Sequence, residues 1–265
     1  MATDELIVEK SEGFWTLIIN RPEKRNSLTP DLLLAMKDVL DSLSENKDVR
    51  AVIVTGAGDK AFSAGFDISA LPTKVLPGTE DELKTNVYVD ACMESIASCA
   101  YPVIAMIDGY ARGAGCELAL SCDIRIASDR ATFGMPPAKL GLVYSAKGMK
   151  KFINAVGFAN TKEIFLTGRP FDAQRAKEMG FVSYVVPSEQ LKEFAYEMAR
   201  EISENAPLSL SGTKTIISYF MNMGQLGKEE EAHCAKLRFE ALKSRDLEEG
   251  RKAFKEKRKP RFRGE

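Results

Sequence analysis

Histidine is almost absent from this chain, because His233 is the only one among 265 residues. A single histidine excludes a histidine-rich metal site, and no metal site is predicted. A Ser-His-Asp triad would have to use His233, which lies in a glutamate-rich segment typical of an exposed helix face. The chemistry of the chain is therefore expected to use carboxylates, tyrosine, backbone amides or a cofactor.

Disulfide spacing, a signal peptide and long apolar runs are also missing. The five cysteines are odd in number and show no CxxC pair, which favours reduced thiols in the cytoplasm. The first residues are acidic, and no apolar stretch follows a basic one. Uncharged runs such as 95–107 are shorter than the roughly 18 residues that a membrane helix needs. We expect a cytoplasmic protein without a membrane segment.

An excess of charge of one sign is missing from the whole chain but present at its end. The sequence contains 37 basic and 38 acidic residues. Residues 250–265 hold eight Lys or Arg and two Glu, a local net charge of +6, while residues 1–249 carry −7. This basic tail is the one region suited to phosphate groups, either of a small ligand or, as a weaker alternative, of a nucleic acid.

Hydrophobic periodicity predicts an α/β core followed by a helical C-terminal region. Thr29 and Pro30 are typical of the cap and first residue of a helix. Strands are predicted at residues 6–10, 14–20, 51–55, 103–107, 124–127, 131–133 and 182–186. Helices are predicted at residues 29–43, 80–98, 113–122, 146–155, 161–166, 173–179, 188–203, 207–221, 228–242 and 246–257.

A glycine pattern after the strand at 51–55 fits the dinucleotide-binding fingerprint. Gly56, Gly58 and Ala61 have the required spacing. The fingerprint also requires a helix to open at these glycines, and residues 62–67 (FSAGFD) form a poor helix interior. Binding of a nicotinamide or flavin dinucleotide therefore stands beside the simpler interpretation of a turn at the end of a strand.

Two further segments join small residues to a tight turn. Residues 62–68 (FSAGFDI) leave backbone amides accessible, and Asp67 is predicted to cap a short following helix. Residues 113–115 (GAG) open a helix whose first amides have no partner. Such a helix start can hold an oxygen that gains negative charge, although no Gly-Lys-Ser/Thr of a phosphate-binding loop follows.

Glu117 is the lone charge between Gly113 and Cys122 and lies about one turn beyond Ala114. Two interpretations remain open: a structural ion pair with Arg112 or Arg125, or a functional carboxylate. A carboxylate one turn from free amides suits enolate chemistry at a carbonyl, where each amide contributes about 3 kcal/mol to transition-state stabilisation.

Three segments in this order resemble the enoyl-CoA hydratase/isomerase, or crotonase, superfamily: residues 62–68, 113–119 (GAGCELA) and 254–260 (FKEKRKP). The resemblance implies an α/β fold made of a crotonase-like spiral of ββα units with a C-terminal helical trimerisation region. It places the acyl-CoA site in residues 1–200 and oligomerisation in residues 201–265. It also implies a homotrimer or homohexamer and an acyl-CoA thioester substrate, with CoA entering as part of the substrate and no separate cofactor.

The same resemblance assigns residues to roles. The amides of Phe66 and Ala114 correspond to the family's oxyanion hole, and the CoA adenine and phosphates would lie near Arg25 and Ala64. By similarity, a neighbouring subunit supplies the remaining CoA contacts, Phe254 and Lys257. The basic tail then attracts CoA phosphates, so no nucleic-acid partner is expected.

Pro137 departs from the family pattern of hydratases, which carry a second glutamate there and share water addition between two carboxylates. Residues 135–144 (MPPAKLGLVY) instead resemble the methylmalonyl-CoA decarboxylase branch, which has a tyrosine where Tyr144 stands but a histidine where Phe66 stands.

The favoured prediction is therefore a lyase that decarboxylates a methylmalonyl-CoA-like substrate. In it Tyr144 orients the departing carboxylate, and Glu117 positions water or donates the proton, although a core tyrosine remains an equal interpretation of Tyr144. The alternative is an enoyl-CoA hydratase or isomerase that uses Glu117 alone. An NAD-dependent oxidoreductase is the remote alternative.

Overall fold

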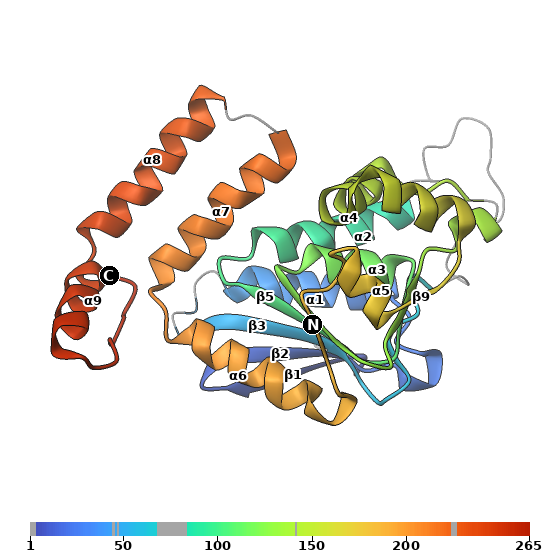
Figure 1. Ribbon diagram of the computed structural model, residues 1–265, viewed down its shortest axis with the longest axis horizontal. Coiled ribbons are helices and arrows are strands. Elements are labelled where there is room, and N and C mark those ends of the chain that lie inside the picture. The colour runs from blue at the N-terminus through green and yellow to red at the C-terminus, as the bar shows by residue number, and fades with distance from the viewer. Residues whose placement is uncertain (1–3, 44–45, 47, 68–83, 141, 224–226) are drawn as a thin grey trace.

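The computed structural model describes residues 4–43, 46, 48–67, 84–140, 142–223 and 227–265. Two sheets lie at the centre of the larger part of the molecule, with helices around them (Figure 1). Within the described residues, none of the helices combines the length and the apolar character needed to cross a membrane.

The larger sheet begins with an antiparallel hairpin and continues with parallel strands. Its strands, in spatial order, are β1 (Leu6–Ser11), β2 (Gly13–Ile19), β3 (Val49–Gly56), β5 (Val103–Ile107), β7 (Ile124–Ser128) and β10 (Tyr184–Val186). Side chains of β3 alternate between the two faces, as expected of a strand that is covered on both sides. The strands predicted for this sheet are confirmed, with ends that differ by up to two residues.

The smaller sheet consists of short strands, three of which directly follow strands of the larger one. Its members are β4 (Ala61–Ser63), β6 (Tyr110–Arg112), β8 (Thr132–Gly134) and β9 (Phe171–Asp172). The chain thus repeats a strand of each sheet followed by a helix, and the predicted spiral of ββα units is confirmed. Only β8 of this sheet was predicted, because three-residue strands carry too little periodicity to detect.

Helices cover both faces of the larger sheet. Apolar residues of α6 (Leu191–Ser203) pack on one face, where Ala51 and Ile53 point. The other face is covered by α1 (Pro30–Ser42), α2 (Lys84–Ser98) and α3 (Ala114–Ser121). The predicted cap of α1 is confirmed, because Leu32 N donates to Thr29 Oγ1 over 3.2 Å.

Two of the predicted helices are confirmed and meet at a kink. The segments expected at 146–155 and 161–166 belong to α4 (Ala146–Thr167), which is interrupted at Gly157 by a backbone φ of 75°. The short helix α5 (Ala173–Glu178) follows, with Asp172 as its cap. The start of α4 lies against α3, and this contact brings the site together.

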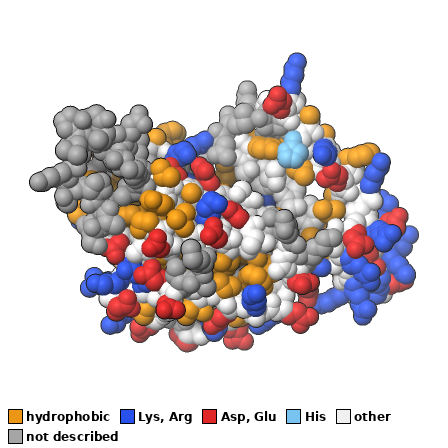
Figure 2. All heavy atoms as spheres, turned by 180° about the vertical axis from the view of Figure 1, so that it is seen from behind, with side chains coloured by type: hydrophobic (Ala, Val, Ile, Leu, Met, Phe, Trp, Pro, Cys, Tyr) orange, Lys and Arg blue, Asp and Glu red, His pale blue; other side chains and the backbone are white. Residues whose placement is uncertain are grey.

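Three C-terminal helices, α7 (Pro207–Met223), α8 (Lys228–Lys243) and α9 (Arg245–Glu256), extend away from the sheets (Figure 1). Figure 2 shows Lys and Arg gathered at the end of the molecule that carries α9. His233 is exposed on α8, as predicted. The division at residue 200 and the role of these helices in trimerisation stay predictions.

Candidate active site

The two small-residue turns of the sequence lie backbone against backbone. A Cβ added at Gly65, where φ is +92°, would stand 2.5 Å from the Arg112 carbonyl oxygen and 3.1 Å from the Ala114 nitrogen. A Cβ at Gly115 would stand 2.4 Å from the Ser63 carbonyl oxygen. Only glycine permits this approach, which places the peptide that ends in Phe66 beside the start of α3.

The Phe66 amide faces away from its neighbouring segment. Leu28 forms an isolated parallel bridge with Phe66 by donating to the Gly65 oxygen over 2.8 Å and accepting from the Asp67 nitrogen over 3.0 Å. These flanking bonds leave the N–H of Phe66 on the opposite side of its segment. In the described part of the chain, this N–H has no hydrogen-bond acceptor.

The Ala114 amide is equally uncommitted. Ala114 is the first residue of α3, so its N–H has no carbonyl one turn earlier in the helix. Gly113, with φ of 52°, turns the chain into the helix, and its own N–H donates to the Gly134 oxygen over 3.0 Å. The two predicted amides are therefore adjacent and without a described backbone acceptor, whereas their role as an oxyanion hole stays a prediction.

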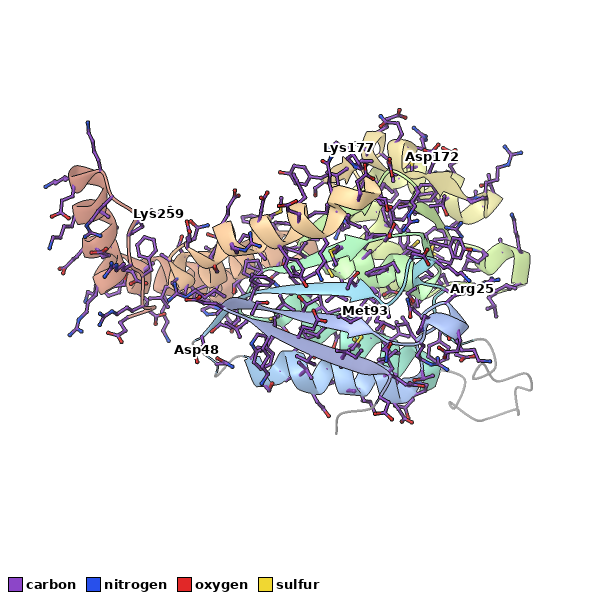
Figure 3. All side chains as sticks on the ribbon, turned by 90° about the horizontal axis from the view of Figure 1, so that it is seen from below. Arg25, Asp48, Met93, Asp172, Lys177 and Lys259 are labelled. Carbon is purple, nitrogen blue, oxygen red and sulfur yellow. The ribbon has the colours of Figure 1, made fainter. Side chains whose placement is uncertain are left out.

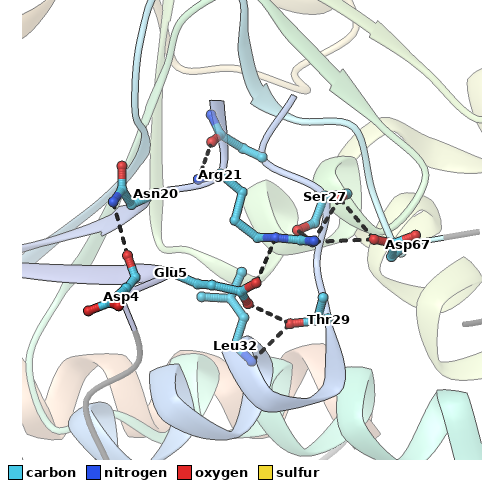
Figure 4. A network of polar contacts seen from close by, with 9 residues as sticks. Asp4, Glu5, Asn20, Arg21, Ser27, Thr29, Leu32 and Asp67 are labelled. Atoms are coloured by element: carbon cyan, nitrogen blue, oxygen red, sulfur yellow. Dashed lines mark hydrogen bonds and ion pairs between the residues drawn. The ribbon is translucent and has the colours of Figure 1, made fainter. Parts of the chain in front are cut away.

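A partly buried arginine network holds the Phe66 segment in place (Figure 4). Arg21 donates to the Ser27 carbonyl oxygen over 2.8 Å, and its Nη1 lies 3.4 Å from Asp67 Oδ2. Its Nε lies 2.9 Å from Glu5 Oε1. Asp67 is therefore fixed directly after Phe66, and the helix that it was predicted to cap lies outside the described residues.

Glu117 is almost completely buried and only partly hydrogen-bonded. Its side chain is 1% exposed, and Tyr144 donates its hydroxyl hydrogen to Oε2 over 2.6 Å. Among the described residues, the other oxygen, Oε1, has no hydrogen-bond partner, and it forms an ion pair with Lys151 Nζ over 3.6 Å. The carboxylate is thus anchored through one oxygen and available through the other.

The predicted ion pair of Glu117 with an arginine is wrong. Arg112 donates instead to the Ala111 carbonyl oxygen and to Thr132. Arg125 donates to carbonyl oxygens of other segments. Both guanidinium groups stabilise strand ends, and the cation beside Glu117 comes from α4.

Burial raises the pKa values of both Glu117 and Tyr144. It raises the pKa of Glu117 above its ordinary value of 4.5, although the hydrogen bond from Tyr144 and the charge of Lys151 both act to lower it. Burial and the neighbouring Glu117 raise the pKa of Tyr144 well above its ordinary range, so Tyr144 stays a neutral donor. A carboxyl group with a raised pKa is a stronger base than an ordinary carboxylate, which suits it to take a proton during a reaction.

Gly148 makes the contact between Tyr144 and Glu117 possible. A Cβ at Gly148 would stand 2.4 Å from the Tyr144 ring and 2.9 Å from Glu117 Oε2. The N–H of Gly148 donates to Ser145, which caps α4. Sequence reasoning missed both Gly148 and Lys151, although their spacing of three places them on one face of the predicted helix at 146–155.

The predicted role of Tyr144 in holding a substrate carboxylate is not confirmed, because the Tyr144 hydroxyl donates to Glu117. It also packs against the core near Phe165, with ring centroids 5.6 Å apart. Pro137 is buried at the start of a short 3-10 turn, Pro137–Leu140, where it offers no acid or base.

Two of the predicted CoA-binding residues are neighbours. The Arg25 carbonyl oxygen accepts from the Ala64 nitrogen over 2.9 Å, and the exposed Arg25 side chain lies 6.0 Å from the Tyr110 ring. Figure 3 places Arg25 and Lys259 at opposite ends of the molecule. Phe254 in α9 and the exposed Lys257 lie at the Lys259 end, so one chain alone does not bring them to Arg25. Their contribution from a neighbouring subunit stays a prediction.

The dinucleotide-binding prediction is wrong. After Gly56 the chain enters β4, not a helix, so no helix start faces the glycines. A Cβ at Gly56 would stand 2.4 Å from the Phe62 carbonyl oxygen, which explains this glycine by close packing. Within the described residues, no three metal-binding side chains gather. That no separate cofactor takes part stays a prediction.

Comparison with known proteins gives one consistent family. A family model described as enoyl-CoA hydratase/isomerase matches residues 9–265. The 2,3-dehydroadipyl-CoA hydratase of Escherichia coli is 32% identical, over 98% of this chain and 99% of its own. The short-chain-enoyl-CoA hydratase of Clostridium acetobutylicum is 34% identical, over 98% and 97%. The crystal structure of an enoyl-CoA hydratase from Bacillus anthracis superposes with a TM-score of 0.89 at 35% identity, covering 99% of this chain and 100% of that one.

Proposed function

Since the chain belongs to the enoyl-CoA hydratase/isomerase family, we propose that it adds water to the double bond of an enoyl-CoA thioester. The observation that carries this proposal is the buried Glu117, held by Tyr144 through one oxygen only, close to the start of the helix that begins with Ala114. Hydration, which the sequence favoured only as the alternative to decarboxylation, also agrees with the names of the relatives.

The amides of Phe66 and Ala114 stabilise the enolate in this proposal. When hydroxide adds to the β-carbon, negative charge moves to the thioester oxygen. Two preorganised N–H donors at that oxygen contribute about 3 kcal/mol each to the transition state. The dipole of α3 adds to this stabilisation, because Ala114 lies at its positive end.

Glu117 is the general base that activates the water. Its Oε1 has no hydrogen-bond partner within the described ranges, whereas Oε2 is fixed by Tyr144, so the orientation of the carboxylate is set before substrate binds. General acid–base catalysis by such a group accelerates a reaction by about 10²–10⁴-fold.

The CoA portion binds at Arg25 and Ala64 in this proposal. Phe254 and Lys257 of a neighbouring subunit complete its site, in a homotrimer or homohexamer that works in the cytoplasm. CoA remains part of the substrate, and no separate cofactor takes part. Arg25 is exposed beside Ala64, which makes its side chain accessible to phosphate groups.

Decarboxylation of a methylmalonyl-CoA-like substrate is the second candidate. It is favoured by Pro137, which leaves the site without a second carboxylate from that position, and it would use the same enolate hole. We place it second because the Tyr144 hydroxyl that was assigned to the departing carboxylate is bound to Glu117.

Three substrates separate the candidates. With crotonyl-CoA, hydration is followed by the loss of enoyl absorbance; with a 3-enoyl-CoA, isomerisation produces that absorbance; with methylmalonyl-CoA, decarboxylation releases CO₂. We expect turnover of crotonyl-CoA. Release of CO₂ without hydration would reverse the order of the two candidates, and no turnover of any of the three would reject both.

A further inference from the structure

Glu117 has only one oxygen free for proton transfer. Its Oε2 is held at 2.6 Å by the Tyr144 hydroxyl, and Oε1 has no hydrogen-bond partner in the part of the chain that the structure describes. Hydration of an enoyl thioester moves two protons, one off the attacking water and one onto the α-carbon. A second group beside Oε1 is therefore useful to the reaction, and Pro137 cannot supply it.

Lys151 stands at this position. Its Nζ lies 3.6 Å from Glu117 Oε1, so the two side chains form an ion pair, at a distance longer than a close hydrogen bond. The Lys151 side chain is 23% exposed, while that of Glu117 is 1% exposed. Lys151 thus links the buried carboxylate to the outside of the site.

We propose that Lys151 is the second proton-transfer group of the reaction, a role that rests on the proposed hydratase function. Glu117 Oε1 takes a proton from water as the water oxygen bonds to the β-carbon. The electrons of the double bond move toward the thioester oxygen and form the enolate. The Lys151 ammonium then protonates the α-carbon, and the neutral amine takes the proton from Glu117, which restores both groups.

Other ionisable groups around this pair come from three helices. On α2, Asp90 opposes the ionisation of Glu117, and its carboxylate lies 3.6 Å from Lys147 of α4. On α3, burial raises the pKa of the Cys116 thiol to about 12, so it remains neutral. Tyr144 also remains neutral. Glu117 and Lys151 are therefore the groups whose protons the reaction uses.

The test compares Lys151→Met with Lys150→Met, which removes the exposed lysine next to it on the same helix. With crotonyl-CoA, we expect kcat of Lys151→Met to fall by about 10²–10⁴-fold across the whole pH range. Lys150→Met should keep the wild-type kcat.

Lys151→Arg separates proton transfer from charge. Arginine keeps the positive charge beside Glu117 but does not release a proton in proteins. We expect its kcat to be as low as that of Lys151→Met, with a similar KM and melting temperature to the wild type. Full activity of Lys151→Arg would show that only the charge matters and would overturn the proposal. A wild type that does not hydrate any enoyl-CoA rejects the function itself.

Discussion

Two carboxylates near β6 are held in opposite ways. Asp108, in the turn between β5 and β6, accepts hydrogen bonds from Arg130 over 2.8 Å, from Ser128 over 2.7 Å and from the Gly109 nitrogen over 3.0 Å. Glu117, in the first turn of α3, accepts one hydrogen bond through one of its oxygens. The first region uses its carboxylate to fasten strands together, whereas the second leaves half of its carboxylate available.

The same contrast separates their pKa values. Burial by itself raises the pKa of Asp108, but the hydrogen bonds from Arg130 and Ser128 outweigh it and hold the pKa below its ordinary value of 3.8. Burial outweighs the partners of Glu117, and its pKa is raised. A fully satisfied carboxylate therefore keeps a fixed charge, while a buried and partly satisfied one can exchange a proton during a reaction.

The largest expected effect comes from Glu117→Gln. Glutamine retains the shape of the side chain but cannot remove a proton from water, so kcat for crotonyl-CoA should fall by about 10²–10⁴-fold. Binding of CoA, measured by calorimetry, should be unchanged. The matched variant Asp108→Asn should keep kcat within a few-fold of the wild type. An equal loss of kcat in both variants would show that the two carboxylates do not differ in function.

A smaller effect is expected from Tyr144→Phe. The Tyr144 hydroxyl stabilises the ionised form of Glu117, so its removal should raise the pKa of Glu117 further and move the acid limb of kcat/KM to higher pH. At pH values below this acid limb, we expect kcat/KM to be about tenfold lower than in the wild type, an effect typical of one hydrogen bond to a charged group. Tyr184→Phe, at an exposed tyrosine of β10, serves as the control. An unshifted acid limb would contradict the assignment of that limb to Glu117.

The smallest effect is on how the free energy of unfolding changes with pH, and its sign differs between Asp108 and Glu117. The pKa of Asp108 is lowered in the fold, so its ionisation stabilises the protein above the ordinary value of 3.8, and this contribution is lost as the pH falls through the lowered pKa. Asp108→Asn should therefore destabilise the protein at neutral pH, by about 1 kcal/mol because Arg130 is exposed.

Glu117 should behave in the opposite way. Its raised pKa means that the wild type loses stability relative to Glu117→Gln as the pH rises from the ordinary value of 4.5 through the raised one. Chemical denaturation of the wild type, Asp108→Asn and Glu117→Gln over a pH series measures how the stability difference of each variant from the wild type changes with pH. Parallel slopes for the two variants would show that the carboxylates do not differ as described.

Much of the architecture could be predicted from local pattern. The strand β5 and the cap of α1 follow directly from an apolar run and from a Thr-Pro pair. The small-residue start of α3 and the lone charge of Glu117 likewise predicted the candidate site, whose role in catalysis stays a prediction. The strand β6 was missed, because a three-residue strand is defined by its partners, whereas the break at Gly157 lies in the gap predicted between residues 155 and 161.

The sequence alone determined which residues could act: one isolated carboxylate, two glycine-rich turns that expose amides, and a proline in place of a second acid. The tertiary structure decided how they combine. Tyr144 and Glu117 are 27 residues apart and meet because the start of α4 packs on α3 over a glycine. Lys151, not an arginine, lies beside Glu117 for the same reason. Local pattern fixes what a segment forms, whereas contacts between distant side chains depend on how the formed segments pack.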